Sequence, residues 1–109
     1  MPSAADYIDD VRKYAGDVDD AALAGIVKHL GITLRNRDSS LVSGSDPVEL
    51  GRIRDGFMTK KLALGLDAAA ADAALAEIVA IMKEDRTKSR VTFYYLLAKK
   101  FDKLGLFGG

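Results

Sequence analysis

The sequence contains no cysteine, and this absence excludes several kinds of chemistry at once. Without thiols the chain has no disulfide, no thiolate nucleophile and no zinc or iron–sulfur centre with cysteine ligands. Histidine is nearly absent too, since His29 is the only one. No nucleophile or carboxylate accompanies it at a recognisable spacing, so we interpret His29 as a partly exposed residue near a helix end. We therefore expect no bound metal and no cofactor.

Long apolar runs and net charge are also missing. No apolar stretch approaches the length of about 20 residues that a transmembrane helix needs, and the first residues lack the pattern of a signal peptide. We therefore expect a cytoplasmic protein without membrane contact. Sixteen Lys and Arg residues balance 16 Asp and Glu residues, giving a formal net charge of +0. This balance argues against a polyelectrolyte partner for the whole surface, so any basic surface must be local.

The sequence motifs of common enzyme classes do not occur either. Several serines are present, but none lies in a Gly-x-Ser-x-Gly motif or has a His or Lys placed as a base. The segment 42–45 lacks the Gly-Lys-Ser/Thr ending of a phosphate-binding loop. We therefore predict that the protein is not an enzyme.

The remaining pattern is that of a small helical protein. At 109 residues the chain fits one domain with one core. The apolar spacing predicts an all-α fold, a compact single-domain bundle of four to five helices around a central C-terminal helix. Helices are expected near residues 4–15, 19–30, 46–64, 67–86 and 88–104, with an irregular segment at 32–45 and a frayed tail at 105–109. No strand pattern is evident.

The helix near 88–104 is expected to be central because its apolar face is wide. Val91, Tyr94 and Tyr95 fall on one side of it, and further apolar residues widen that side to more than half the circumference. Thr92 falls on the remaining strip together with the lysines. Leu96 lies there too, so we expect it to be an exposed leucine.

The helix near 46–64 has the clearest start. Asp46 is a suitable N-cap and Pro47 suits the first position. Its interior holds Gly51 and Gly56, each costing roughly 1 kcal/mol relative to alanine. Close packing of another helix explains such glycines, and so does ordinary marginal helix propensity. The sequence leaves both explanations open.

Charge is distributed unevenly along the chain. Residues 1–20 carry six Asp against two basic residues, and residues 83–103 carry seven Lys or Arg against three acidic residues, so the two ends hold about −4 and +4. The charges can complement each other within one molecule. Alternatively, the basic end meets an acidic partner, either a second copy of the chain or nucleic acid.

Two groups of residues are candidate sites. The first is an interaction surface on the last helix, which Lys60 and Lys61 would extend: Lys88, Arg90, Leu96, Lys99, Lys100 and Lys103. The second is an anion-binding loop that ends at a helix N-terminus: Arg35, Arg37, Ser39, Ser40, Ser43 and Arg52. Alternatively, the arginines of this loop pair with nearby aspartates at the surface.

Several segments resemble those of a family of small bacterial all-helical proteins catalogued as a domain of unknown function. The segments, which occur in the same order, are 28–31 (KHLG), 35–43 (RNRDSSLVS), 45–46 (SD) and 88–98 (KSRVTFYYLLA). The resemblance implies a bacterial cytoplasmic protein and an all-helical fold. It also draws attention to the loop at 35–43 and to the start of the last helix.

Taken together, the sequence predicts a non-enzymatic module that binds an unidentified protein or its own copy through the surface of the last helix. The alternative is a nucleic-acid-associated protein that binds phosphates through the Lys and Arg stripe of that helix. The two differ in their response to salt, because phosphate contacts weaken strongly as salt rises and apolar contacts do not.

Overall fold

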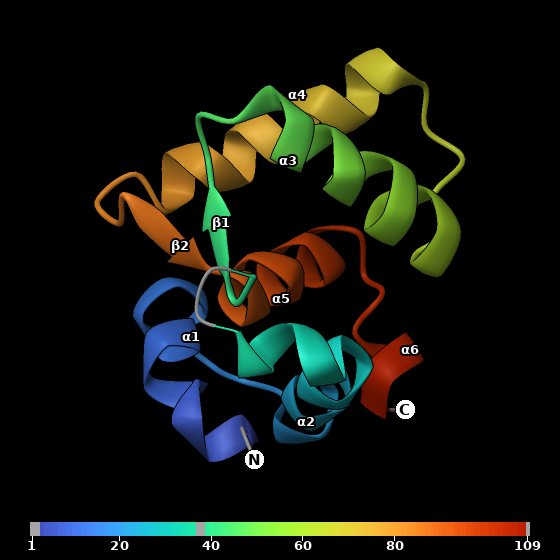
Figure 1. The fold of residues 1–109 in the computed structure, drawn as a ribbon. Helices are drawn as coiled ribbons and strands as arrows, with labels where there is room; N and C mark the ends of the chain where they lie inside the picture. Colours follow the sequence, from blue (N-terminus) through green and yellow to red (C-terminus); the bar gives the residue numbers. More distant parts are fainter. Residues whose placement is uncertain (1–2, 37–38, 109) are drawn as a thin grey trace.

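Helix α5 (Arg90–Lys100) lies in the middle of the molecule, and the other helices surround it. The computed structural model describes residues 3–36 and 39–108. Figure 1 shows α5 between an upper layer, formed by α3 (Pro47–Arg52) and α4 (Ala68–Ile81), and a lower layer that includes α1 (Ile8–Ala15) and α2 (Asp20–Leu30). The all-α prediction, with a central helix near the C-terminus, is confirmed.

Burial of α5 is more complete than its sequence pattern predicts. Every residue from Val91 to Ala98 is buried, including Thr92 and Leu96, which we expected on an exposed strip. The prediction was wrong because it left one strip of the helix exposed to solvent, whereas α1, α2 and α4 all contact α5. Thr92 is satisfied in this setting because its hydroxyl donates to the Asp10 carboxylate of α1.

The N-terminal part forms the lower layer. The expected helix near 4–15 is divided into a 3₁₀ turn, η1 (Ala4–Asp6), and α1, while α2 matches its predicted range closely. Asp19 caps α2, and its side chain accepts a hydrogen bond of 3.0 Å from the Ala22 amide. Gly31 follows the end of α2 with a φ of 43°, a conformation that favours glycine.

Two short strands join the layers, although none was predicted. After the 3₁₀ helix η2 (Gly31–Arg35), strand β1 (Leu41–Ser43) pairs with β2 (Thr87–Ser89) in antiparallel register, with Val42 opposite Lys88. Strands of three residues are too short to show an alternating pattern in the sequence. The pairing fixes the loop that follows η2 against the start of α5.

The expected single helix near 46–64 changes its hydrogen bonding midway. Asp46 caps α3 as predicted, and from Ile53 to Lys61 the chain continues as a π-helix, η3. The Leu62 amide donates to the carbonyl of Phe57, five residues back, at 2.9 Å, and the Thr59 hydroxyl donates to the carbonyl of Arg54 at 2.9 Å. A side chain inserted into the hydrogen-bond ladder and glycine in the interior both favour departure from α geometry.

The remaining boundaries also differ from the prediction. Helix α4 ends at Ile81 rather than near 86, because β2 follows, and α5 occupies Arg90–Lys100 within the expected 88–104. Residues 105–108, which we expected to fray, form a short helix, α6 (Gly105–Gly108), packed on α2. No helix within the described ranges has both the length and the apolar character needed to cross a bilayer.

Candidate functional site

The predicted interaction surface on the last helix is mostly not a surface. Lys88 and Arg90 are only 4% and 9% exposed, and Leu96 is 6% exposed. The ammonium group of Lys88 donates to the carbonyl of Asp85 at 2.6 Å. These three residues are therefore part of the packed interior, and they correct the expectation that they face a partner.

Arg90 acts as an internal clamp. Its Nε donates to the carbonyl of Ser39 at 2.6 Å, and its Nη2 donates to the carbonyl of Leu41 at 3.2 Å and to the Glu49 carboxylate. Its Nη1 donates to the hydroxyl of Tyr94 at 3.2 Å. The guanidinium group thus ties the loop before β1 and helix α3 to α5, a use suited to its planar set of donors.

The three lysines at the end of α5 do not form one patch with these residues. The ammonium group of Lys99 donates to the carbonyl of Ala15 at 2.9 Å, and Lys100 forms an ion pair with Glu77 at 2.5 Å. Lys103 lies beyond α5 and is half-buried. Local partners therefore hold two of the lysines on which the predicted stripe depended.

The predicted anion-binding loop is also used for internal contacts. The hydroxyl of Ser39 donates to the carbonyl of Thr33 at 2.6 Å, and the hydroxyls of Ser43 and Ser45 lie 3.4 Å apart. Ser40 is half-buried and Arg35 is exposed, whereas Arg37 lies outside the described residues. Among the members of this group that the structure describes, only Arg52 lines the groove described next.

A groove of about 510 Å³ opens where the end of α2, η2, α3, η3 and α5 meet. We call it the basic groove. The residues that line it are His29, Leu30, Thr33, Arg52, Gly56, Phe57, Lys60, Lys61 and Tyr94. Its lining contains no Asp or Glu among the described residues, so its electrostatic potential is set by the basic side chains.

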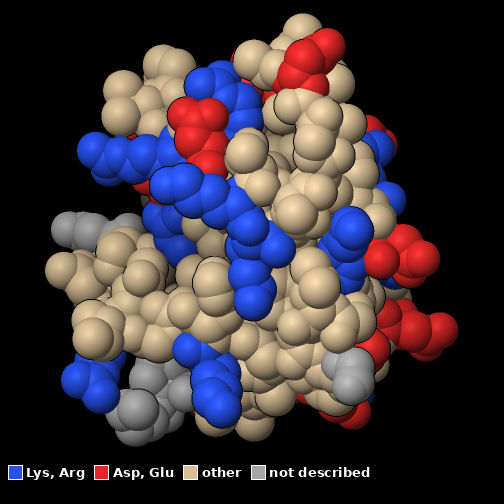
Figure 2. Space-filling model, turned by 90° about the vertical axis from the view of Figure 1, so that its right-hand side faces the viewer, with Lys and Arg blue, Asp and Glu red and all other residues tan. Residues whose placement is uncertain are grey.

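The positive charges of the basic groove are not neutralised by close ion pairs, although Asp55 interacts with Lys60: the pKa of Asp55 is lowered mainly by Arg54 and also by Lys60. Within residues 3–36 and 39–108, no carboxylate oxygen lies within 4.0 Å of the charged nitrogens of Arg52, Lys60 or Lys61. Figure 2 views the molecule from the side where η3 ends and α6 lies in Figure 1. Lys and Arg side chains gather across the centre and left of this face, and most Asp and Glu side chains lie toward its top and right edges.

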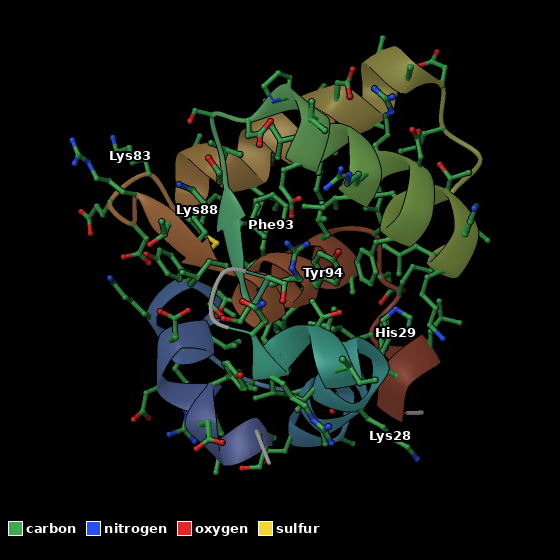
Figure 3. All side chains as sticks on the ribbon, in the orientation of Figure 1. Lys28, His29, Lys83, Lys88, Phe93 and Tyr94 are labelled. Atoms are coloured by element: carbon green, nitrogen blue, oxygen red, sulfur yellow. The ribbon has the colours of Figure 1, made fainter. Side chains whose placement is uncertain are left out.

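Aromatic rings form the base of the groove. The rings of Phe57 and Tyr94 stack with centroids 4.0 Å apart, and the ring of Phe107 lies 5.9 Å from both Phe57 and His29. Figure 3 shows His29 on the side of the molecule where α6 lies, with Tyr94 nearer the centre. The aromatic packing fixes the positions from which the basic side chains extend.

His29 reports the electrostatics of the groove. Burial against its neighbours lowers the pKa of His29 below the ordinary value, and the positive charge of Lys61 lowers this pKa further. A helix C-terminus favours the charged imidazole, and desolvation and the neighbouring cation act in the opposite direction.

The sequence alone does not show that the residues lining the groove lie close together. We considered Lys60 and Lys61 as an extension of a stripe on the last helix and set His29 apart as a helix-end residue. The fold instead brings both lysines to His29, and the wider turn of η3 sets where they project. A π-helix is itself an indicator of function, because such turns occur frequently at functional sites.

Other ligand chemistry finds less support in the structure. Nowhere among the described residues do three or more His, Asp or Glu side chains come together as metal ligands. A neighbouring hollow of about 520 Å³ contains Asp46 and Glu49. Both are engaged, because Asp46 caps α3 and Glu49 pairs with Arg90.

Comparison with known proteins addresses the family of the chain. A search of the curated proteins found no match. The model of the family described as a protein of unknown function, DUF2853, matches residues 6–105. The match spans helices α1 to α5 and every residue named as lining the basic groove. The resemblance noted from the sequence is thereby confirmed, and the chain belongs to the DUF2853 family.

Proposed function

We propose that the protein is a non-enzymatic binding module that holds an anionic group of its ligand in the basic groove. The observation that carries this proposal is the placement of Arg52, Lys60 and Lys61. These three exposed cations line one groove, and among the described residues none is paired with a carboxylate.

The electrostatics of the groove support an anion as the ligand. Cations held near one another repel, and a bound anion relieves that repulsion while it accepts charge-assisted hydrogen bonds. The lowered pKa of His29, caused by burial and by Lys61, has the sign expected beside an unneutralised positive cluster. Lys100, at the end of α5, forms an ion pair with Glu77 instead.

The lining of the groove also supports binding rather than catalysis. Nucleophilic and acid–base sites usually pair a histidine with a carboxylate that orients it. His29 has aromatic and cationic neighbours instead. Binding through the last helix, which the sequence suggested, is not retained because Lys88, Arg90 and Leu96 are buried.

The proposal is tested by titrating the protein with inorganic phosphate at constant ionic strength and following its NMR spectrum. We expect saturable shifts of the His29 ring signals and of the amides of η3. The double variant Lys60→Gln/Lys61→Gln removes two of the cations, together with the contact of Lys61 with the Phe107 ring, and it should abolish the saturable shifts.

A matched variant controls for the loss of two positive charges. Lys83 and Arg86 are exposed and lie by the turn after α4, far from His29; Figure 3 labels Lys83 on the opposite side of the molecule. Lys83→Gln/Arg86→Gln should therefore bind phosphate as the unmodified protein does. Equal loss in both double variants, or the absence of any saturable shift, would contradict the proposal.

A further inference from the structure

The basic groove is closed toward its acidic side. Arg52 and Tyr94 line both the groove and the neighbouring hollow, and beyond them that hollow contains Asp46 and Glu49. A chain of phosphates leaving the groove in this direction would meet the Asp46 carboxylate and the ion pair of Glu49 with Arg90. Beyond Arg52 the hollow therefore adds no net positive charge to the surface on this side.

The other side of the groove is bounded by α6. The ring of Phe107 packs 5.9 Å from His29, and the ammonium nitrogen of Lys61 lies 5.3 Å from the centroid of the same ring. Helix α6 packs closely against α2 at Gly25. A Cβ atom added to Gly25 would lie only 1.9 Å from the Phe107 carbonyl oxygen. The groove therefore ends against a packed element.

Between these ends the groove offers space and apolar surface as well as charge. A Cβ atom added to Gly56 would meet no atom within 4 Å, so this glycine leaves open room in the lining. Leu30, Phe57 and Tyr94 supply apolar surface beside it. The volume of about 510 Å³ falls in the range of small-molecule sites, which combine apolar walls with a few placed polar groups.

Tyr94 lines both the groove and the neighbouring hollow, and its hydroxyl is hydrogen-bonded to Arg90, which lines the hollow. The hydroxyl oxygen of Tyr94 accepts a hydrogen bond from Arg90, and no described residue accepts the proton of that hydroxyl. Burial raises the pKa of Tyr94, so the hydroxyl keeps its proton at neutral pH.

We infer that the ligand of the basic groove is a small phosphate monoester rather than a nucleic-acid chain. The phosphate lies among Arg52, Lys60 and Lys61, and the organic part lies over Gly56 against Leu30 and Tyr94. This inference rests on the proposed function, because it names the ligand class of the same site. The net charge of +0 agrees with it, since a polymer is drawn to a protein by an extended positive field.

The inference is tested by comparing the affinities of several probes through the His29 ring signals. The probes are inorganic phosphate, a nucleoside monophosphate, a sugar monophosphate, succinate, and a short and a long oligothymidylate. We expect at least one monoester to bind about tenfold or more tightly than inorganic phosphate, because only the monoester uses the apolar part of the groove. Succinate should bind more weakly than that monoester.

A glycine variant locates the organic part of the ligand. Gly56→Leu fills the open space in the groove, and it should remove the advantage of the monoester over inorganic phosphate while leaving phosphate binding. Gly51 has similar room, since the nearest atom to its added Cβ is Arg54 Nη2 at 3.9 Å, but it lines a different hollow, between α3 and α4. Gly51→Leu is the matched control and should leave both affinities unchanged.

The outcomes separate this inference from the proposed function. If affinity rises with oligonucleotide length and no monoester exceeds inorganic phosphate, the groove binds anions but the monoester inference is overturned. Equal binding of succinate and the best monoester would overturn it as well. If no anion shifts the His29 signals, both the inference and the proposed function are wrong.

Discussion

The ammonium nitrogen of Lys61 lies 5.3 Å from the centroid of the Phe107 ring, so the basic groove and the C-terminal helix α6 share a contact. The same ring packs against His29 and Phe57. Cation–π contacts of this kind contribute about 0.5–1 kcal/mol at exposed sites. The position of α6 therefore affects the shape of the groove, although α6 contains only residues 105–108.

Replacement of Gly25 by alanine should displace α6. The added Cβ would overlap the Phe107 carbonyl, which is backbone and cannot turn away, so we expect a loss of about 1–3 kcal/mol in the free energy of unfolding. Urea denaturation measures this change, and NMR should show altered His29 and Phe57 signals. Gly56→Ala is the control: it has open space, and alanine should raise stability by up to about 1 kcal/mol. Unchanged stability in Gly25→Ala would show that α6 is not packed as described.

Arg90 and Glu49 should each stabilise the folded protein mainly when the other residue is present. Arg90→Met leaves the Glu49 carboxylate and the carbonyls of Ser39 and Leu41 without their donor, so we expect a loss of about 3 kcal/mol. The double variant Arg90→Met/Glu49→Leu should recover much of that loss, because no buried charge is then left alone. A double-mutant cycle of chemical denaturation measures the coupling. Strictly additive effects would mean that the two side chains do not interact.

Substitution of Leu96 should act on folding and not on an exposed contact. Leu96→Asp places a carboxylate at a buried position and removes an apolar side chain, so the free energy of unfolding should fall by about 3 kcal/mol or more. Ile81 is the matched control. Ile81 and Leu96 line one hollow beside the end of α5, but the side chain of Ile81 is 46% exposed. Ile81→Asp should cost less than about 1 kcal/mol. Equal and small effects at both positions, measured by thermal or urea unfolding, would place Leu96 at the surface.

Much of the fold follows from local signals that the sequence displays openly. Asp and Ser are typical N-cap residues, and Asp19, Asp46 and Ser89 each accept a hydrogen bond from a backbone amide in the structure. The wide apolar face near 88–104 also identified the central helix. These signals are readable because cap chemistry and apolar periodicity involve residues only a few positions apart.

Features that depend on distant contacts were not predictable in the same way. Thr92 and Leu96 look exposed on a helical wheel, but α1 and the other neighbours of α5 cover them. The β1–β2 pairing joins residues 41–43 to 87–89, and nothing within either segment reveals its partner.

The candidate site was missed for the same reason. His29 and Lys61 are 32 positions apart in the sequence, and the groove exists only because α2 and η3 end beside each other. The predicted arginine loop contributed Arg52 alone among the described residues. Serines of that loop form hydrogen bonds with nearby backbone carbonyls and with one another, as short polar side chains in loops often do.

The pKa of His29, measured by NMR of its ring protons with and without a saturating phosphate monoester, tests the central claim most directly. His29 is the only histidine, so its signals need no separation from others. The charged groups that line the groove with His29 are Arg52, Lys60 and Lys61. Lys28 precedes His29 in α2, Asp55 of η3 interacts with Lys60, and α6 contributes the uncharged Phe107.

In the free protein the pKa of His29 should lie below its ordinary value of about 6.5, because burial and Lys61 disfavour the charged ring. A phosphate bound among these cations favours the charged ring, so the pKa should rise on binding. By linkage, the phosphate dianion should then bind more tightly as pH falls from the bound-state pKa of His29 toward its free-state pKa. A pKa of His29 that is identical with and without saturating monoester would contradict the placement of the ligand in the basic groove.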